Sequence, residues 1–216
     1  MRLQDRLFEQ REFAILAAAR QLFSEQPWDR VTIAEVASAA SIGKGTVYKH
    51  FPSKEALYAR LVLDRSRADL DELRAVQAAS APQQAMRQVL LRAFAQMLGN
   101  PLQAQLCRHC DRPEFQERLE PPYRQLFLDL ERDYQLFFAE LLGDVLGGQA
   151  LSQADCQNLL WGVEACVNGV TARIAAGGFA HWVEPIALDE YFTRVTEFII
   201  AGLRAQAADL LAQRHE

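Results

Sequence analysis

The chain has 216 residues, half of them hydrophobic, and four cysteines, which excludes a disordered chain and a disulfide-stapled scaffold. Residues 1–60 hold nine Lys or Arg and seven Asp or Glu, a net charge of +2, whereas residues 61–216 hold fourteen and twenty-one, a net charge of −7. The acidic larger part excludes a DNA-packaging protein, which would need a basic body.

The N-terminal sequence MRLQDRLFEQREF mixes charges and lacks the basic-then-apolar order of a secretory signal, so we expect a cytoplasmic protein. The longest apolar runs, FAILAAA and FIIAGL, are shorter than the roughly 20 residues that cross a bilayer, so we expect no membrane partner. Apolar residues recur at helical spacing without sustained alternation, and this predicts an all-α fold.

The N-terminal part predicts three helices. The first runs from about Asp5 to Glu25 and carries an apolar stripe. Thr32 followed by Glu35 predicts a capping box that opens a short second helix. The chain then turns through SIG and restarts as KGTVYKHF, which Pro52 ends. A short helix, a tight turn and a basic second helix predict a helix-turn-helix within a three-helix bundle.

All three lysines of the chain lie within eleven positions, around this second short helix. In a helix-turn-helix this element enters the major groove, where small residues permit close approach and polar side chains contact bases or phosphates. A merely solvated helix surface is the alternative, but it does not need two glycines that weaken a helix. The candidate DNA contacts are Gly43, Lys44, Gly45, Thr46, Tyr48, Lys49, His50 and Lys54.

The segment VTIAEVASAASIGKGTVYKHFPSKEAL resembles the DNA-binding signature of the TetR/AcrR family of bacterial transcriptional regulators, over about residues 10–60. The resemblance implies a two-fold dimer on a palindromic operator. It also implies that the operator contacts come from the aligned positions, which are Thr32, Lys44, Thr46, Tyr48, His50 and Lys54.

Two positions depart from the family pattern. The family usually has Gly, a β-branched residue and Ser where this chain has Ser41, Ile42 and Gly43. We therefore expect Ser41 to adopt the turn conformation that a glycine normally relieves. Gly43 lacks the hydroxyl that would hydrogen-bond to phosphate, so we expect that contact to be lost.

The rest of the chain predicts six longer helices. Ser53 starts a long one, Pro82 and Pro101 start the next two, and a fourth begins at the double proline 121–122. Ser152 with Asp155 caps a fifth, and a sixth covers about 188–212. We therefore expect a DNA-binding domain at 1–52 and a helical effector-binding and dimerisation domain at 53–216.

The last two long helices carry small residues and apolar residues in stripes. Such stripes permit close helix packing, either within one subunit or, as the resemblance implies, across a four-helix dimer interface. The candidate interface residues are Gly162, Ala165, Gly169, Ala172, Phe192, Val195, Phe198, Ile199 and Gly202.

An effector pocket is a further implication of the resemblance. We expect an apolar ligand with a polar or cationic group, held by residues of three helices. These are Phe94, Leu98, Leu126, Phe127, Leu130, Tyr134, Trp161, Glu164 and Asn168.

The segment CRHCDRPEF places Cys107 and Cys110 at i, i+3 beside His109. A thiol switch is an alternative form of regulation, but two packed small hydrophobes are the simpler interpretation, and a closed zinc site would need four ligands. No nucleophile elbow, phosphate loop, metal triad or nucleotide fingerprint is present, so we expect no enzyme, metal or cofactor. The sequence predicts a ligand-responsive transcriptional regulator, expected to be a repressor; a helical small-molecule-binding protein or enzyme without DNA function is the alternative.

Overall fold

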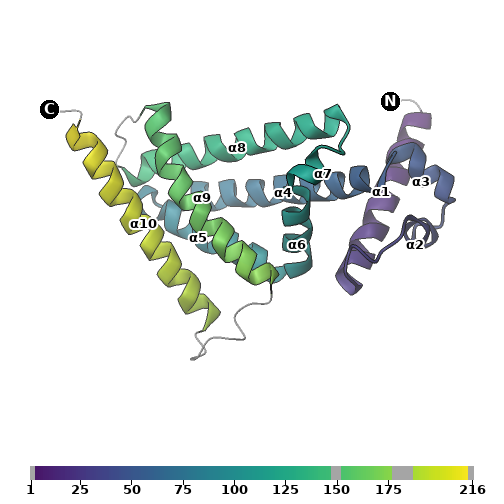
Figure 1. The fold of residues 1–216 in the computed structure, drawn as a ribbon, viewed down its shortest axis with the longest axis horizontal. Coiled ribbons are helices and arrows are strands. Elements are labelled where there is room, and N and C mark those ends of the chain that lie inside the picture. The colour runs from purple at the N-terminus through teal and green to yellow at the C-terminus, as the bar shows by residue number, and fades with distance from the viewer. Residues whose placement is uncertain (1–2, 147–151, 177–186, 214–216) are drawn as a thin grey trace. The chain divides into compact units, whose positions relative to one another are not determined.

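The computed structural model describes residues 3–146, 152–176 and 187–213, and within these ranges the regular elements are all helices (Figure 1). The predicted all-α class is therefore confirmed. The helices are α1 (Leu3–Glu25), α2 (Ile33–Ala39), α3 (Lys44–His50), α4 (Lys54–Ala79), α5 (Pro82–Gly99), α6 (Pro101–Cys110), α7 (Pro113–Gln116), α8 (Pro121–Val145), α9 (Gln153–Ala175) and α10 (Leu188–Gln213).

The chain forms two compact units. Unit 1 comprises Met1–Arg65 with Leu102–Leu128, and unit 2 comprises Ser66–Pro101 with Asp129–Glu216. Each unit is thus assembled from two separate stretches of chain, and both α4 and α8 contribute residues to each unit. A functional division after residue 52 remains a prediction, because contact-based units do not test it.

The helix-turn-helix begins at the predicted capping box. The backbone N–H of Glu35 donates to Thr32 Oγ1 at 3.2 Å, and the Thr32 N–H donates to Glu35 Oε2 at 2.7 Å. Two donors that α2 cannot pair internally are satisfied in this way. α2 then packs against both α1 and α3 (Figure 1).

The turn between α2 and α3 has the backbone conformation that the sequence predicted. Ser41 has a φ of 56°, the only positive value at a non-glycine residue in the described part of the chain. Its N–H donates to the carbonyl of Ser38 at 3.0 Å, and the Ile42 N–H donates to the carbonyl of Ala37 at 2.9 Å. These bonds hold a residue with a Cβ in a region that normally costs about 1 to 2 kcal/mol.

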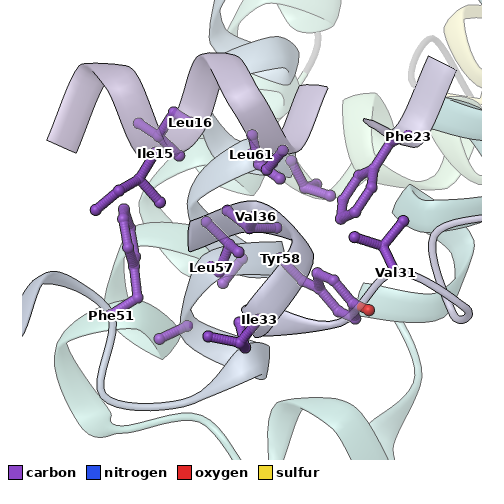
Figure 2. Close-up of a cluster of buried hydrophobic side chains, with 14 of the residues drawn as sticks. Ile15, Leu16, Phe23, Val31, Ile33, Val36, Phe51, Leu57, Tyr58 and Leu61 are labelled. Atoms are coloured by element: carbon purple, nitrogen blue, oxygen red, sulfur yellow. The ribbon is translucent and has the colours of Figure 1, made fainter. Parts of the chain in front are cut away.

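The core of unit 1 joins α1, α2, α3 and α4. Figure 2 shows Ile15 of α1 beside Phe51 and Phe23 of α1 beside Val31, with Val36 of α2 and Leu57 and Leu61 of α4 between these pairs. Val47 of α3 and the following Phe51 are both almost fully buried in the same cluster. Burying large side chains of this kind contributes about 1.5 to 3 kcal/mol each.

The same core includes residues from α6, α7 and the loop that follows. Leu106 and Cys110 of α6, Phe115 of α7 and Leu119 are all buried in the cluster that surrounds the helix-turn-helix. Gln116 Nε2 donates to the carbonyl of Cys110 at 2.6 Å, which ties α7 to the end of α6. The four-residue α7 was not predicted, since a single turn after Pro113 has no helical period to detect.

The core of unit 2 lies among α5, α9 and α10, which contact one another pairwise (Figure 1). Phe94 of α5 stacks on Phe192 of α10 with ring centroids 5.2 Å apart. α8 adds Phe137, Leu141 and Leu142 to this cluster. No helix in the described ranges has the length and apolar character to cross a bilayer.

The strained turn leads to a stability prediction. Replacing Ser41 by Gly removes the Cβ that disfavours a positive φ, so we expect the free energy of unfolding to rise by about 1 kcal/mol. Urea unfolding followed by circular dichroism measures the change. The matched control is Ser38→Gly in the helical α2, where we expect a loss of about 0.5 kcal/mol. A loss of stability at both positions would contradict the assignment of strain to Ser41.

Candidate nucleic-acid interface

α3 has one buried face and one bare face. Val47 is fully buried, whereas Lys44, Gly45, Tyr48 and Lys49 are exposed. Residues three and four apart lie on the same side of a helix, so Gly45, Tyr48 and Lys49 form one continuous surface. With Lys44, which is exposed and lies four residues before Tyr48, this surface contains two ammonium groups, a phenol and a stretch of uncovered backbone.

The glycines of this surface have no structural necessity within the chain. A Cβ added at Gly43 or Gly45 would meet no atom within 4 Å, and neither residue has a positive φ. An interior helical glycine costs about 1 kcal/mol relative to alanine. Gly45 therefore leaves the backbone of α3 uncovered on this side, where a side chain would fit.

Two polar side chains of α3, those of Lys44 and Tyr48, contact each other. Lys44 Nζ lies 5.9 Å from the centre of the Tyr48 ring, and the Tyr48 side chain remains 43% exposed. Thr46 is half-buried beside them. A cation over an aromatic face interacts favourably and limits the freedom of both side chains. Both groups still present their polar ends to solvent.

Two of the predicted contacts, Thr32 and Lys54, already have partners within unit 1. The Thr32 hydroxyl serves the capping box, and the Lys54 ammonium donates to the carbonyl of Asp29 at 3.3 Å and lies 5.2 Å from the Tyr58 ring centre. Both side chains keep some exposure. Their role in DNA contact remains a prediction.

His50 is much less accessible than its neighbours in α3. Its side chain is 2% exposed, its ring lies against Phe8 with centroids 3.9 Å apart, and Nδ1 has no hydrogen-bond partner. Burial lowers the pKa of His50 from 6.5, while the Glu12 carboxylate, 4.0 Å from Nδ1, opposes this and Arg11 reinforces it. A phosphate contact by His50 remains a prediction, and it requires the imidazole to reach past Phe8.

Phe8 and Glu12 were not singled out from the sequence. They stand one helical turn apart on α1, so they share a face, but nothing in the sequence indicates that this face meets the end of α3. Glu12 also pairs with Arg60 of α4, with Arg60 Nη1 2.8 Å from Glu12 Oε1. These two residues fix the position of His50.

Residues 15–61 match the family model for bacterial regulatory proteins of the tetR family. The matched stretch contains the capping box, the Ser41 turn and the bare face of α3. Over this stretch the chain is similar to the bacterial regulatory proteins of the tetR family.

Curated relatives share this N-terminal stretch. EthR, an HTH-type transcriptional regulator of Mycobacterium tuberculosis, is 42% identical over 57 residues, which is 26% of each chain. UidR, an HTH-type transcriptional regulator of Escherichia coli, is 42% identical over 55 residues, which is 25% of this chain and 28% of UidR. The matches thus span about a quarter of the length of these relatives.

Solved structures of transcriptional regulators share the fold over most of the chain. FadR of Bacillus subtilis, solved in complex with stearoyl-CoA, has a TM-score of 0.62 at 16% identity, covering 88% of this chain and 98% of FadR. At this identity the likeness concerns the fold. The fold of unit 2 is therefore shared even where its sequence has diverged.

The predicted effector residues are dispersed in the structure. Phe94 is fully buried against Phe192, and Trp161 is 58% exposed. Glu164 and Asn168 are exposed and hydrogen-bonded to each other at 3.4 Å. The remaining five are buried or half-buried: Phe127 packs against the core of unit 1, Leu98 and Tyr134 pack against the core of unit 2, Leu126 is half-buried and Leu130 is buried. Effector contact by any of them remains a prediction.

The predicted dimer residues divide into two groups. Phe192 and Ile199 are buried in the core of unit 2, and Ala172 and Val195 are half-buried. The others form exposed surface on α9 and α10, with Phe198 72% exposed. These are Gly162, Ala165, Gly169, Phe198 and Gly202. The intrasubunit packing that the sequence left open therefore accounts for the first group, and the second is available to a partner.

The cysteine pair lies in and beside the core of unit 1. Cys110 is fully buried, and burial raises the pKa of its thiol. Cys107 is half-buried and packs against the same cluster. A buried thiol with a raised pKa is a poor nucleophile. Across the described residues, no group of three His, Cys, Asp or Glu side chains is placed to hold a metal ion.

The environment of His50 leads to a prediction about pH. Because the folded state holds the pKa of His50 below 6.5, the unfolded chain binds the proton first as the pH falls. The stability from the neutral imidazole is thus lost as the pH drops through 6.5 and below. NMR titration of the histidine ring protons, with His50 assigned through His50→Gln, measures the value. Titration at or above 6.5 would mean that the ring is solvated or paired as a cation.

Proposed function

We propose that this chain is a transcriptional regulator of the TetR family that acts in the cytoplasm. Two copies would bind a palindromic operator, and a small, largely apolar effector would release them, which makes the protein a repressor. The proposed function includes no catalytic reaction. The DNA contacts would come from α3, the dimer from α9 and α10, and the effector site from unit 2.

The observation that carries this proposal is the bare backbone at Gly45. A helix that was only a structural support would gain stability from alanine there, because a Cβ has open space around it. In a major groove the same open space lets α3 approach the phosphate backbone and base edges. Lys44 and Lys49 on the exposed side supply charge for phosphate, and Tyr48 supplies a hydroxyl donor.

The unpartnered residues of α9 and α10 support the dimer. Phe198 and Trp161 are large apolar side chains left 72% and 58% exposed. A Cβ added at Gly162, Gly169 or Gly202 would also meet nothing within 4 Å. Small residues beside exposed aromatic ones suit close packing of helices from a second copy. Two α3 helices about 34–36 Å apart would then match successive major grooves.

The effector proposal follows from the continuity of α4. Its residues up to Arg65 belong to the unit that holds the helix-turn-helix, and its remaining residues belong to unit 2. A ligand that favours one position of α4 would change the spacing of the two α3 helices. It must bind the free and operator-bound forms with different affinities, since equal affinities shift nothing. FadR, with the same fold, holds stearoyl-CoA, which supports a largely apolar ligand.

Gly45→Ala tests the DNA function through opposite effects on stability and binding. We expect the free energy of unfolding to rise by up to about 1 kcal/mol, because alanine favours a helix. We expect affinity for a DNA fragment from upstream of the gene to fall, because the methyl group occupies the side of α3 that meets the DNA. Fluorescence anisotropy with salt titration measures binding. Lys44→Gln should lower the slope of log affinity against log salt by about one.

The control for Gly45→Ala is Gly143→Ala. Gly143 lies within α8, and a Cβ there also meets nothing within 4 Å. The control should therefore gain similar stability and bind DNA as the native protein does. Unchanged DNA affinity in Gly45→Ala, or an equal loss in Gly143→Ala, would contradict the assignment of α3 to the operator.

Phe198→Arg tests the dimer. An arginine at a position that becomes buried between two copies leaves a charge without a partner, so we expect monomers in analytical ultracentrifugation. Leu136→Arg on α8 is the control, because Leu136 is 59% exposed and outside the proposed interface. A native protein that is already monomeric, or a dimer that survives Phe198→Arg, would show that α10 is not the interface.

A further inference from the structure

A surface pocket of about 560 Å³ lies within unit 1, and no residue of α3 lines it. Its walls come from Glu55 at the start of α4, His109 at the end of α6, and Arg112, Phe115 and Arg118 in and around α7. None of these residues takes part in the proposed DNA, dimer or effector contacts. The pocket is therefore a feature that the proposed function does not use.

Two arginines of the pocket, Arg112 and Arg118, are exposed and only weakly bound by other side chains. Arg112 is exposed and forms no ion pair with any described residue. Arg118 has a 72% exposed side chain, and its Nη1 lies 4.0 Å from Glu55 Oε1, the outer limit of an ion pair. An exposed pair of this kind contributes at most about 1 kcal/mol. Both guanidinium groups can therefore turn toward a bound group at small cost.

The third nitrogen-bearing side chain of the pocket, His109, is held in place by aromatic rings. Its ring centroid lies 4.4 Å from that of Trp28, 5.1 Å from that of Phe115 and 6.4 Å from that of Tyr58. Tyr58 in turn donates its hydroxyl to the carbonyl of Trp28 at 2.8 Å. The imidazole edge that faces the pocket is thus fixed by α4, α7 and the loop that precedes α2.

We infer that this pocket binds a small anion with a carboxylate or phosphate group, through Arg112, Arg118 and His109. A guanidinium fork matches the two oxygens of either group, and charge-assisted hydrogen bonds are about twice as strong as neutral ones. The anion would displace Glu55 from its weak contact with Arg118. Glu114, the other carboxylate of the wall, repels an anion, so the charged group of the ligand must lie close to the guanidinium groups.

The charges around His109 make its titration a local indicator of binding. Burial lowers its pKa from 6.5, Arg112 and Arg118 add to this, and Glu55 and Asp29 oppose it. An anion between the two arginines would stabilise the imidazolium, so saturation should raise the pKa of His109. The pKa of His50, whose neighbours Phe8 and Glu12 do not line the pocket, should stay unchanged.

Isothermal titration of the full chain with inorganic phosphate and, separately, with succinate tests the inference, in a zwitterionic buffer free of other anions that bind arginine. We expect saturable binding of at least one anion, and the tighter one identifies the class of ligand. Arg112→Gln and Arg118→Gln should each weaken it by about tenfold, the loss of one charge-assisted contact. Glu55→Gln should strengthen it, because a competing carboxylate is removed.

Two matched variants separate this pocket from other basic surfaces. Arg108→Gln removes the same charge from the exposed side of α6, outside the pocket, and Lys44→Gln removes one from α3. Both should bind the anion as the native protein does. Absence of saturable binding, equal affinity in Arg112→Gln and Arg108→Gln, or loss in Lys44→Gln alone would overturn the inference. These outcomes are independent of operator binding.

Discussion

The interface on α3 depends on the burial of Val47 and Phe51. A helix of seven residues is far too short to be stable in water by itself, so its existence and its orientation come from packing. Val47 and Phe51 lie one turn apart and enter the core of α1, α2 and α4 together. Their burial determines which side of α3 remains bare, and thereby where Gly45 and the lysines lie.

The turn before α3 shows a second effect of this packing. Ser41 adopts a left-handed conformation that glycine would adopt without strain, and Gly43 begins α3 without a side-chain cap. Both features weaken the local structure of the helix-turn-helix. They persist because the buried side chains on either side, Ala37 and Val47, determine the path of the chain between them. The free energy of burying these side chains thus stabilises a backbone conformation that the local sequence disfavours.

The sequence predicted what local chemistry determines. The capping box at Thr32, the N-cap at Ser152, the starts at Pro82 and Pro101 and the strained Ser41 all depend on residues a few positions apart, and the structure confirms them. Packing between residues far apart in the sequence could not be predicted from local patterns. Trp161, Glu164 and Asn168 do share one side of α9, but periodicity does not reveal whether that side meets a cavity or solvent. The burial of His50 under Phe8 was missed for the same reason.

The sequence also did not indicate that residues 102–128 belong to unit 1. This placement affects more of the structure than the other features that the sequence did not predict. Cys110 and Phe115 are buried in the same cluster as Ile33 and Val47, and His109 lies against Trp28, so α6 and α7 are part of the support of the helix-turn-helix. Close-packed cores do not deform continuously. A ligand that prefers one arrangement of α6 and α7 therefore also prefers one arrangement of the loop before α2. If the proposed operator binding favours one arrangement of that loop, reciprocity requires that operator and ligand alter each other's affinity by the same factor.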